Sequence, residues 1–426
     1  RLLRLSRTYG DRHDSDVTAG EVDGTPEELL SPAGIESLRI MASKEAPDDL
    51  LRKSDRELFQ SMRLLSERGR LRKAAILLAG RNERIAQCFP GYSWSFLRMR
   101  SSTEYDLSER GNDCLAIAIP RIEGLIQPSN PLTVVEQGLL HLEFRRYPIL
   151  ALREGLMNAF AHGDYRSHGV TQVKLFDDRM EIANPGGLIG GVSVQNILRH
   201  APVTRNPTLV NALISLNLAN RNNLGVPRMY RAMLQDGKEP PVIRDEGNAV
   251  RIIFLGSDYS VPFRAFVESA MRRGFRLSLE HLLVLNYLIR HGEIDADTAA
   301  HICQQHEREA RESLRQLVLE GIIDPRRRGA KHYWQLTTSA SRVLRGEDEA
   351  KVAPATKYEG AERDLLALLH KAHEQSRPGV RTGELRRHLE LTEEDMKYLL
   401  RKLRAKNIIK SSGKGPNATW SIVGEA

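Results

Sequence analysis

Apolar residues recur at helical spacing between Ala151 and Tyr165, which predicts a helix over this stretch. The apolar stripe consists of Leu152, Leu156, Ala159 and Phe160. Three polar residues, Glu154, Asn158 and His162, lie four positions apart and therefore share a second face of the predicted helix. The pattern predicts an amphipathic helix whose polar face carries a carboxylate, a carboxamide and an imidazole.

The polar face of this helix has the chemistry of a metal–phosphate site. The carboxylate of Glu154 can accept a proton from an attacking water molecule. The carboxamide oxygen of Asn158 can bind Mg²⁺, a hard cation that prefers oxygen ligands and keeps several waters. The alternative is a solvated polar face on an ordinary amphipathic helix.

Strand patterns follow the helix. Residues 170–176 and 180–183 read as two strands joined by an Asp-Asp turn, which predicts a β-hairpin. The second strand runs into Asn184, Gly186 and Gly187, and glycines at this point let the backbone approach a flat ligand closely.

Two further helix starts are predicted downstream. One follows Arg205 and Asn206, and the other follows a glycine turn that contains Gly225. The unpaired N–H groups and the positive dipole end of a helix N-terminus favour phosphate. Arg205 and Asn206 are therefore candidates to contact a γ-phosphate, with a helix-initiating turn as the equal alternative. Arg228 is expected to be a surface or structural arginine.

The remainder of the first 260 residues mixes the two patterns. Helices are predicted to start at Ser31-Pro32 and Asp55 and to cover residues 57–65 and 113–125. Strands are predicted at residues 73–78, 94–100, 134–144 and 250–255. Together with the hairpin, these elements predict an α+β fold with a mixed, mainly antiparallel sheet and helices on one face.

A different pattern occupies the C-terminal part of the chain, and it occurs twice. Short helices are predicted at 279–291, 294–303 and 307–320, followed by strands around a turn at 324–331. After a charged linker, helices at 362–373, 382–389 and 392–406 are followed by strands up to residue 423. Three helices and a β-wing are typical of a winged helix-turn-helix, whose third helix enters the DNA major groove.

Charge favours DNA as the partner of these two modules. The net charge is +8, and residues 272–426 contain 28 Lys and Arg against 22 Asp and Glu. The basic candidates for DNA contact are Arg326, Arg327, Arg328, Lys331, Lys397, Arg401, Lys402, Lys410 and Lys414. The alternative is a winged helix that binds protein, which Glu307, Glu309 and Glu312 favour for the first module.

Composition limits the class of protein. The 426 residues are 41% hydrophobic and 28% charged, which is enough for two to four globular domains. The three cysteines form no C-x-x-C pair, and no apolar run approaches membrane-spanning length. These features predict a cytoplasmic protein with no membrane partner and free thiols; a homodimer remains open.

Five motifs in a fixed order resemble a known domain. They are A-L-R-E-x-x-x-N-A, H-x-D-Y, D-D-R-x-E-I-x-N-P-G-G-L, R-N-P and G-V-x-R-M. This order resembles the RecG-like C-terminal domain, which is similar to the GHKL ATPases with the Bergerat ATP-binding fold. The resemblance covers about Pro131 to Leu255.

No P-loop motif is present in the sequence, so a helicase activity is not implied. The Schlafen-like module that usually precedes this domain is not apparent.

The resemblance implies specific roles. Glu154 matches the general base and Asn158 the Mg²⁺ ligand. Asn184 matches the aspartate that receives the adenine amino group, with Gly186 and Gly187 beside it, and Gly225 falls in the second glycine box. Asn in place of Asp lacks the charge that strengthens such a bond, and the second box lacks a full G-x-G. Both departures favour weak ATP binding or slow turnover.

The expected organisation and function follow from these observations. The expected segments are a loose lead-in (1–25), an α/β connecting domain (26–130), a GHKL-like domain (131–257), a first winged helix (258–346), a linker (347–359) and a second winged helix (360–426). The sequence predicts a regulator that binds Mg-ATP and DNA, in transcription or nucleic-acid-linked defence. The alternatives are an active Mg²⁺-dependent ATPase coupled to DNA remodelling, and a DNA-binding protein without nucleotide.

Overall fold

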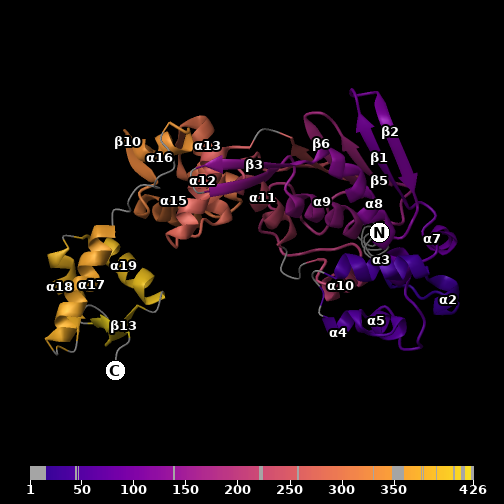
Figure 1. Ribbon diagram of the computed structural model, residues 1–426, viewed down its shortest axis with the longest axis horizontal. Helices are drawn as coiled ribbons and strands as arrows, with labels where there is room; N and C mark the ends of the chain where they lie inside the picture. Colours follow the sequence, from indigo (N-terminus) through magenta and orange to yellow (C-terminus); the bar gives the residue numbers. More distant parts are fainter. Residues whose placement is uncertain are drawn as a thin grey trace, which may run out of the picture. The chain divides into compact units, whose positions relative to one another are not determined.

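A central sheet organises the N-terminal part of the chain. The computed structural model describes residues 16–423 except 44–45, 47, 138–139, 220–223, 257–258, 330, 348–358, 376, 378, 390, 406–407 and 414–417. Within these residues the strand order is β2-β1-β5-β6-β8-β7 (Figure 1). The strands are β1 (Ser93–Met99), β2 (Tyr105–Gly111), β5 (Val170–Leu175), β6 (Arg179–Pro185), β7 (Val242–Asp245) and β8 (Ala249–Leu255). Only the β1–β5 pair of this sheet is parallel, so the mixed, mainly antiparallel sheet is confirmed.

Helices cover one face of this sheet. They include α8 (Leu115–Ile126), α9 (Ile149–Ala161) and α11 (Gly225–Gln235) (Figure 1). Ile182 and Phe254 are fully buried on the helix side. On the other side Glu181 pairs with Arg179 at 2.7 Å and with Arg251 at 3.1 Å. The apolar side chains face the helices and the ion pairs face away, as predicted for a sheet covered on one face.

The N-terminal part of the chain corrects one predicted strand. Its helices are α2 (Pro26–Leu29), α3 (Pro32–Ala42), α4 (Asp48–Leu51), α5 (Asp55–Ser61), α6 (Lys73–Ala79) and α7 (Asn82–Cys88). The predicted strand at 73–78 is wrong, because these residues form α6. All residues from Ala74 to Ala79 are fully buried, and a short run that is apolar all round shows no period that separates strand from helix.

The segment before α2 is ordered from residue 16 onward. Thr18 lies in the 3₁₀-helix η1 (Val17–Ala19) and is fully buried. Asp16 accepts hydrogen bonds from the backbone N (2.7 Å) and the Oγ1 (2.6 Å) of Thr208, in the first turn of α10 (Pro207–Ser215). A helix start needs such acceptors, and here a distant residue supplies them. The expectation of a loose lead-in is therefore wrong for residues 16–25, and residues 1–15 lie outside the described part.

Residues 26–130 contribute to the same sheet as the segment that follows. β1 pairs with β5 along six residues from Ser93–Val170 to Arg98–Leu175, so the central sheet spans the expected domain boundary at residue 130. The predicted strand at 134–144 is instead a hairpin of β3 (Leu132–Gln137) and β4 (Leu140–Arg145).

The chain forms two compact units. The boundary between them lies between Val267 and Glu268, near the middle of α12 (Val261–Arg272), and residues 303–305 belong to the first unit. In the second unit, the elements after α12 are α13 (Leu279–His291), β9 (Glu293–Ile294), α14 (Ala296–Cys303), α15 (Glu307–Leu319), β10 (Ile323–Arg328), β11 (Lys331–Leu336) and α16 (Thr338–Leu344). Their strands have the order β10-β11-β9. This order of elements is compatible with the first predicted winged helix.

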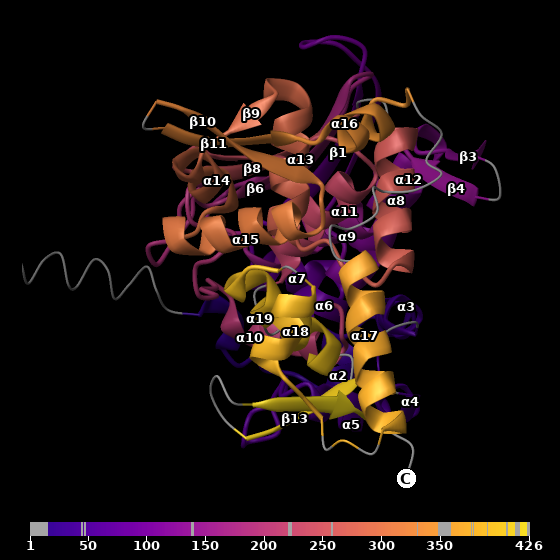
Figure 2. The same cartoon turned by 90° about the vertical axis from the view of Figure 1, so that its left-hand side faces the viewer.

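The same order returns at the C-terminus (Figure 2). The elements are α17 (Glu359–Glu374), β12 (Val380–Arg381), α18 (Thr382–His388), α19 (Glu393–Ala405), β13 (Ile409–Ser412) and β14 (Thr419–Ile422). Leu365, Leu385 and Leu403 are fully buried in a hydrophobic core that also includes Leu319 of α15. The arrangement is compatible with the second predicted winged helix, and most of the expected linker lies outside the described residues.

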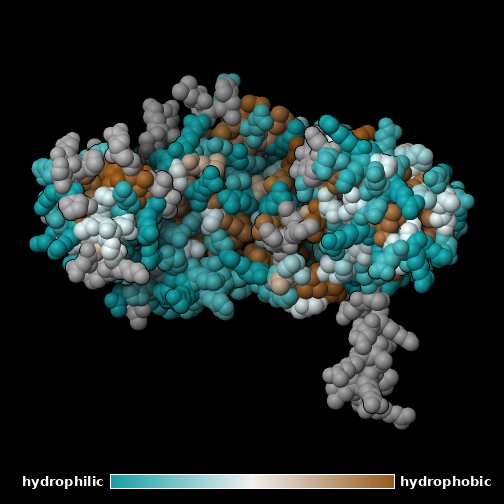
Figure 3. Space-filling model, turned by 90° about the horizontal axis from the view of Figure 1, so that it is seen from below, coloured by the Kyte–Doolittle hydropathy of each residue, from teal (hydrophilic) through white to brown (hydrophobic). Residues whose placement is uncertain are grey.

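None of the helices within the described residues is both long and apolar enough to cross a bilayer. On the face drawn in Figure 3, hydrophilic residues predominate.

Candidate nucleotide site

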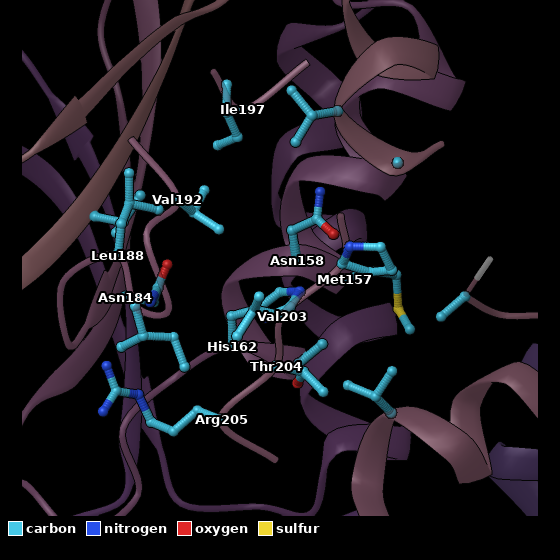
Figure 4. A pocket seen from close by; sticks show the side chains of 18 of the residues that line it. Met157, Asn158, His162, Asn184, Leu188, Val192, Ile197, Val203, Thr204 and Arg205 are labelled. Carbon is cyan, nitrogen blue, oxygen red and sulfur yellow. The ribbon is translucent and has the colours of Figure 1, made fainter. Parts of the chain in front are cut away.

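A cavity of about 360 Å³ lies in the first unit beside α9. Its walls come from α9, from β6, β7 and β8, from the loop at 186–205, from α10 and from the start of α11. Figure 4 shows Asn158 and His162 on the helix side and Asn184 on the strand side. Residues predicted from separate motifs therefore meet at one cavity.

All three residues of the polar face of α9 line the cavity, and Glu154 is the buried one among them. The Glu154 side chain is 11% exposed, and Glu154 and Asn158 both line the cavity. Burial raises the pKa of Glu154, while Arg228 and Arg153 act in the opposite direction. A carboxylate with a raised pKa at a cavity wall is suited to accept a proton.

Gly225 brings the start of α11 against this carboxylate. A Cβ built at Gly225 would lie 3.1 Å from Oε2 of Glu154 and 3.3 Å from Oδ1 of Asn158. The glycine therefore lets the helix start approach both polar side chains. On the same helix, Nη1 of Arg228 forms an ion pair with Oε1 of Glu154 at 3.0 Å. Arg228 is thus a partner of the predicted base, which the sequence did not reveal.

Asn184 lies at the end of β6 and is 5% exposed. Its Nδ2 donates a hydrogen bond to the carbonyl oxygen of Pro185 at 3.1 Å, which leaves Oδ1 as the group that can accept a hydrogen bond at the cavity (Figure 4). An acceptor in this position matches the amino group of adenine.

The structure favours glycine at positions 186 and 187 for two different reasons. Gly186 adopts a φ of +89°, where a side chain is strained. A Cβ at Gly187 would lie 2.3 Å from the carbonyl oxygen of Gly247. Both residues line the cavity, so the backbone itself forms this part of its wall.

Arg205 lines the cavity but is held by protein groups. It pairs with Asp164 at 3.5 Å and donates to the carbonyl oxygen of Gly187 at 3.1 Å. Figure 4 shows it on the Asn184 side, away from Asn158. Arg205 therefore lies near the predicted adenine end of the cavity rather than beside Asn158.

Asn206 does not line the cavity and is the N-cap residue of α10, which favours the alternative of a helix-initiating turn. Asn206 is fully buried, and its Nδ2 donates to the carbonyl oxygens of Ala161 (3.0 Å) and Gly163 (2.9 Å) at the end of α9. Its carboxamide joins the end of α9 to the start of α10 instead of facing the cavity.

His162 faces the cavity at the end of α9 (Figure 4). The surrounding protein and the positive charge of Arg205 lower its pKa to about 4, so its ring is neutral at pH 7. The nearby Asp164 pairs with Arg166 at 3.1 Å and with Arg205. His162 is thus a neutral polar group on the cavity wall.

Sequence reasoning missed the apolar part of the cavity. This part is formed by Leu188, Ile189, Val192, Ile197, Val203, Val210, Ile214, Ile243, Val250 and Ile252. The first five belong to a loop and follow no helix or strand period, and β7, which carries Ile243, was not predicted. An apolar wall opposite a few polar groups suits a flat base.

One donor atom at the cavity, the carboxamide oxygen of Asn158, is of the kind that Mg²⁺ prefers. Asn158 offers a carboxamide oxygen, and its Nδ2 is buried without a hydrogen-bond partner among the described residues. No group of three or more His, Cys, Asp or Glu side chains in the described part could hold a metal ion alone. A single protein oxygen completed by phosphate oxygens and waters is a usual arrangement for Mg²⁺.

The predicted DNA contacts lie on the second unit. Arg326, Arg327 and Arg328 are exposed on β10, and Lys331 begins β11. Acidic residues partly neutralise two of them, since Arg326 pairs with Asp324 (3.5 Å) and Arg328 with Glu293 (3.2 Å).

In the second predicted winged helix, the structure describes the side chains of some of the predicted DNA contacts. Lys397 pairs with Glu393 at 2.6 Å on α19, and Arg401 is exposed on the same helix. Lys410 is exposed on β13. Lys414 and the side chain of Lys402 lie outside the described residues.

Parts of this chain resemble known proteins. Residues 169–254 match the family model described as "Putative ATP-dependent DNA helicase recG C-terminal". The crystal structure of the DIP2311 protein from Corynebacterium diphtheriae is similar, with a TM-score of 0.66 at 22% sequence identity, over 80% of this chain and 66% of that chain. At this identity the likeness shows the fold alone. No curated protein matches the chain. The chain therefore contains an ATPase-like domain that resembles the RecG C-terminal and GHKL-type ATP-binding domains.

Proposed function

We propose that the first unit binds an adenine nucleotide with Mg²⁺ and that the chain is a DNA-binding regulator. The observation that carries the nucleotide proposal is one cavity lined by Glu154, Asn158, Asn184, Gly225 and the Gly186–Gly187 turn. These residues come from three separate segments of the chain, and their meeting at one cavity supports the roles that their motifs imply.

The chemistry divides between the two ends of the cavity. At one end Asn184 Oδ1 accepts a hydrogen bond from the base, which lies against the apolar wall. At the other end Asn158 is the residue that would hold Mg²⁺, which would neutralise phosphate charge. Glu154 would accept the proton of the attacking water if ATP is hydrolysed.

Isothermal titration calorimetry with ATP, with and without Mg²⁺, tests the nucleotide proposal. We expect binding that is stronger with Mg²⁺ than without it. If no heat of binding is detected under either condition, the result would favour the alternative of a DNA-binding protein that binds no nucleotide. A steady-state hydrolysis assay then separates a slow regulator from the active Mg²⁺-dependent ATPase.

Asn184→Asp is expected to tighten adenine nucleotide binding by about 1 kcal/mol, because a charged acceptor makes a stronger hydrogen bond to the amino group. The substitution also removes the Nδ2 donor to Pro185, so the unliganded protein should melt at a lower temperature. The measurement compares ATP with GTP by calorimetry. An equal gain for both nucleotides, or none for either, would mean that Asn184 does not read the base.

Exposed basic side chains on β10 and α19 support the DNA proposal. Arg327 donates through Nε to the carbonyl oxygen of Gly329, and within the described residues no carboxylate pairs with it. Its charge is therefore available to a phosphate. A protein partner is the alternative, because Glu307 and Glu309 lie in the first turn of α15.

Replacing Arg326, Arg327 and Arg328 together with Ala should weaken DNA binding about equally across sequences, because phosphate contacts do not read bases. The slope of log affinity against log salt should flatten by nearly one unit per lost contact, as measured with random duplex DNA. Arg110→Ala, an exposed arginine on β2, is the control for lost charge. Lys397→Ala or Arg401→Ala should instead change preference between sequences. An unchanged slope in the triple variant would favour a protein contact for this wing.

A further inference from the structure

Arg228 and Glu154 form the closest contact between α11 and the predicted base. Oε1 of Glu154 lies 3.0 Å from Nη1 of Arg228, while Oε2 lies beside Gly225 at the start of the same helix. Residues 225 and 228 are three apart, so they share the face of α11 that meets α9. One helix therefore contacts both carboxylate oxygens.

The ion pair fixes the orientation of this carboxylate. The Glu154 side chain is 11% exposed and the Arg228 side chain 42%, so the acid is the more buried partner. A buried carboxylate without a partner would turn toward another donor or take up a proton. Arg228 supplies the partner at Oε1.

Arg228 contacts Glu154 from outside the cavity. Among the described residues that line the cavity, Glu154 and Gly225 are included and Arg228 is not. A nucleotide in this cavity would therefore contact Glu154, and the guanidinium of Arg228 would lie on the other side of that carboxylate. We expect any effect of Arg228 on the reaction to act through its ion pair with Glu154.

We infer that Arg228 is a positioning residue, which holds Glu154 by one oxygen so that the carboxylate stays aligned toward the water that attacks the γ-phosphate. The inference rests on the proposed function, since it requires that the cavity binds ATP. It gives the arginine of the G-V-P-R-M segment a role in turnover rather than in nucleotide affinity. Arg153 also adds positive charge near Glu154, and a change at Arg228 leaves it in place.

The experiment compares Arg228→Ala, Arg228→Lys and the control Arg231→Ala in the full chain. Alanine favours the helix, so α11 should persist in both alanine variants. We expect Arg228→Ala to lower kcat by roughly tenfold to a hundredfold, as for a misplaced catalytic group, with the ATP dissociation constant within about twofold of wild type. Arg228→Lys keeps the charge and should recover part of kcat, and Arg231→Ala should resemble wild type.

Each other outcome has a distinct meaning. An unchanged kcat in Arg228→Ala, or a parallel loss of ATP affinity, would overturn the positioning role. A wild-type protein that binds ATP and does not hydrolyse it would also overturn this role but leave the nucleotide proposal intact. A wild-type protein that binds no ATP would overturn the proposed function itself.

Discussion

Asn158→Ala is expected to abolish Mg²⁺-dependent ATP binding. Asn158 supplies a carboxamide oxygen at the end of the cavity where we propose that the phosphates bind, and within the described residues no cluster of acidic, histidine or cysteine side chains could hold the ion instead. Without that oxygen, the phosphates would enter a largely apolar cavity with less compensation of their charge. The measurement is calorimetry with ATP at fixed Mg²⁺ and in the presence of a chelator.

Asn158→Asp is the matched control, because it keeps an oxygen ligand of the same length. It should retain binding that depends on Mg²⁺. Undiminished Mg-ATP affinity in Asn158→Ala would contradict the metal role of this residue, and a loss of affinity in both variants would indicate a structural one. Circular dichroism would show whether each variant keeps its helical content.

Glu154→Ala is expected to leave ATP binding in place and to slow any hydrolysis by on the order of a hundredfold or more, if Glu154 is the base. The change frees Arg228, whose side chain is 42% exposed and can be solvated, so the loss of the ion pair should cost little stability. The measurement is steady-state phosphate release beside calorimetry on the same preparation.

Glu143→Gln on β4 is the control for this variant, because Glu143 is exposed and lies outside the cavity lining. It should hydrolyse ATP at the wild-type rate. If wild type and Glu154→Ala hydrolyse ATP equally fast, Glu154 is a structural residue and the inference about Arg228 fails with it.

Local patterns predicted the elements that carry the site. The stripe on α9 identified Glu154 and Asn158, because helical spacing determines which side chains share a face. The turn after β6 identified Asn184 and its glycines, because strand ends and glycine turns have strong sequence signals. The structure then brings these residues to one cavity, which spacing alone did not establish.

Features that depend on tertiary packing were missed. The ion pair of Arg228 with Glu154 joins α11 to α9, and the capping of α10 by Asp16 joins residues 192 positions apart. The burial of Asn206 has the same origin, since its partners lie at the end of α9. The residues themselves are visible in the sequence, but their partners are set by the fold.

The strand predicted at 73–78 failed for a related reason. A short apolar run is consistent with a buried strand or a buried helix, and only its packing decides. Here Lys73–Ala79 forms a helix whose apolar side chains are buried in the N-terminal core. The first strand of the central sheet along the chain is instead β1. The two C-terminal modules were predicted well as elements, because capped amphipathic helices carry their signals locally.

A crystal structure of the protein with Mg²⁺ and a non-hydrolysable ATP analogue would test the central claim most directly. We predict that the amino group of adenine lies within hydrogen-bond distance of Asn184 Oδ1, with the base against the apolar wall. We also predict a metal ion bound to the Asn158 oxygen, and the γ-phosphate on the Glu154 side. A nucleotide bound elsewhere, or one with its base at Asn158 and its phosphates at Asn184, would contradict the proposed site.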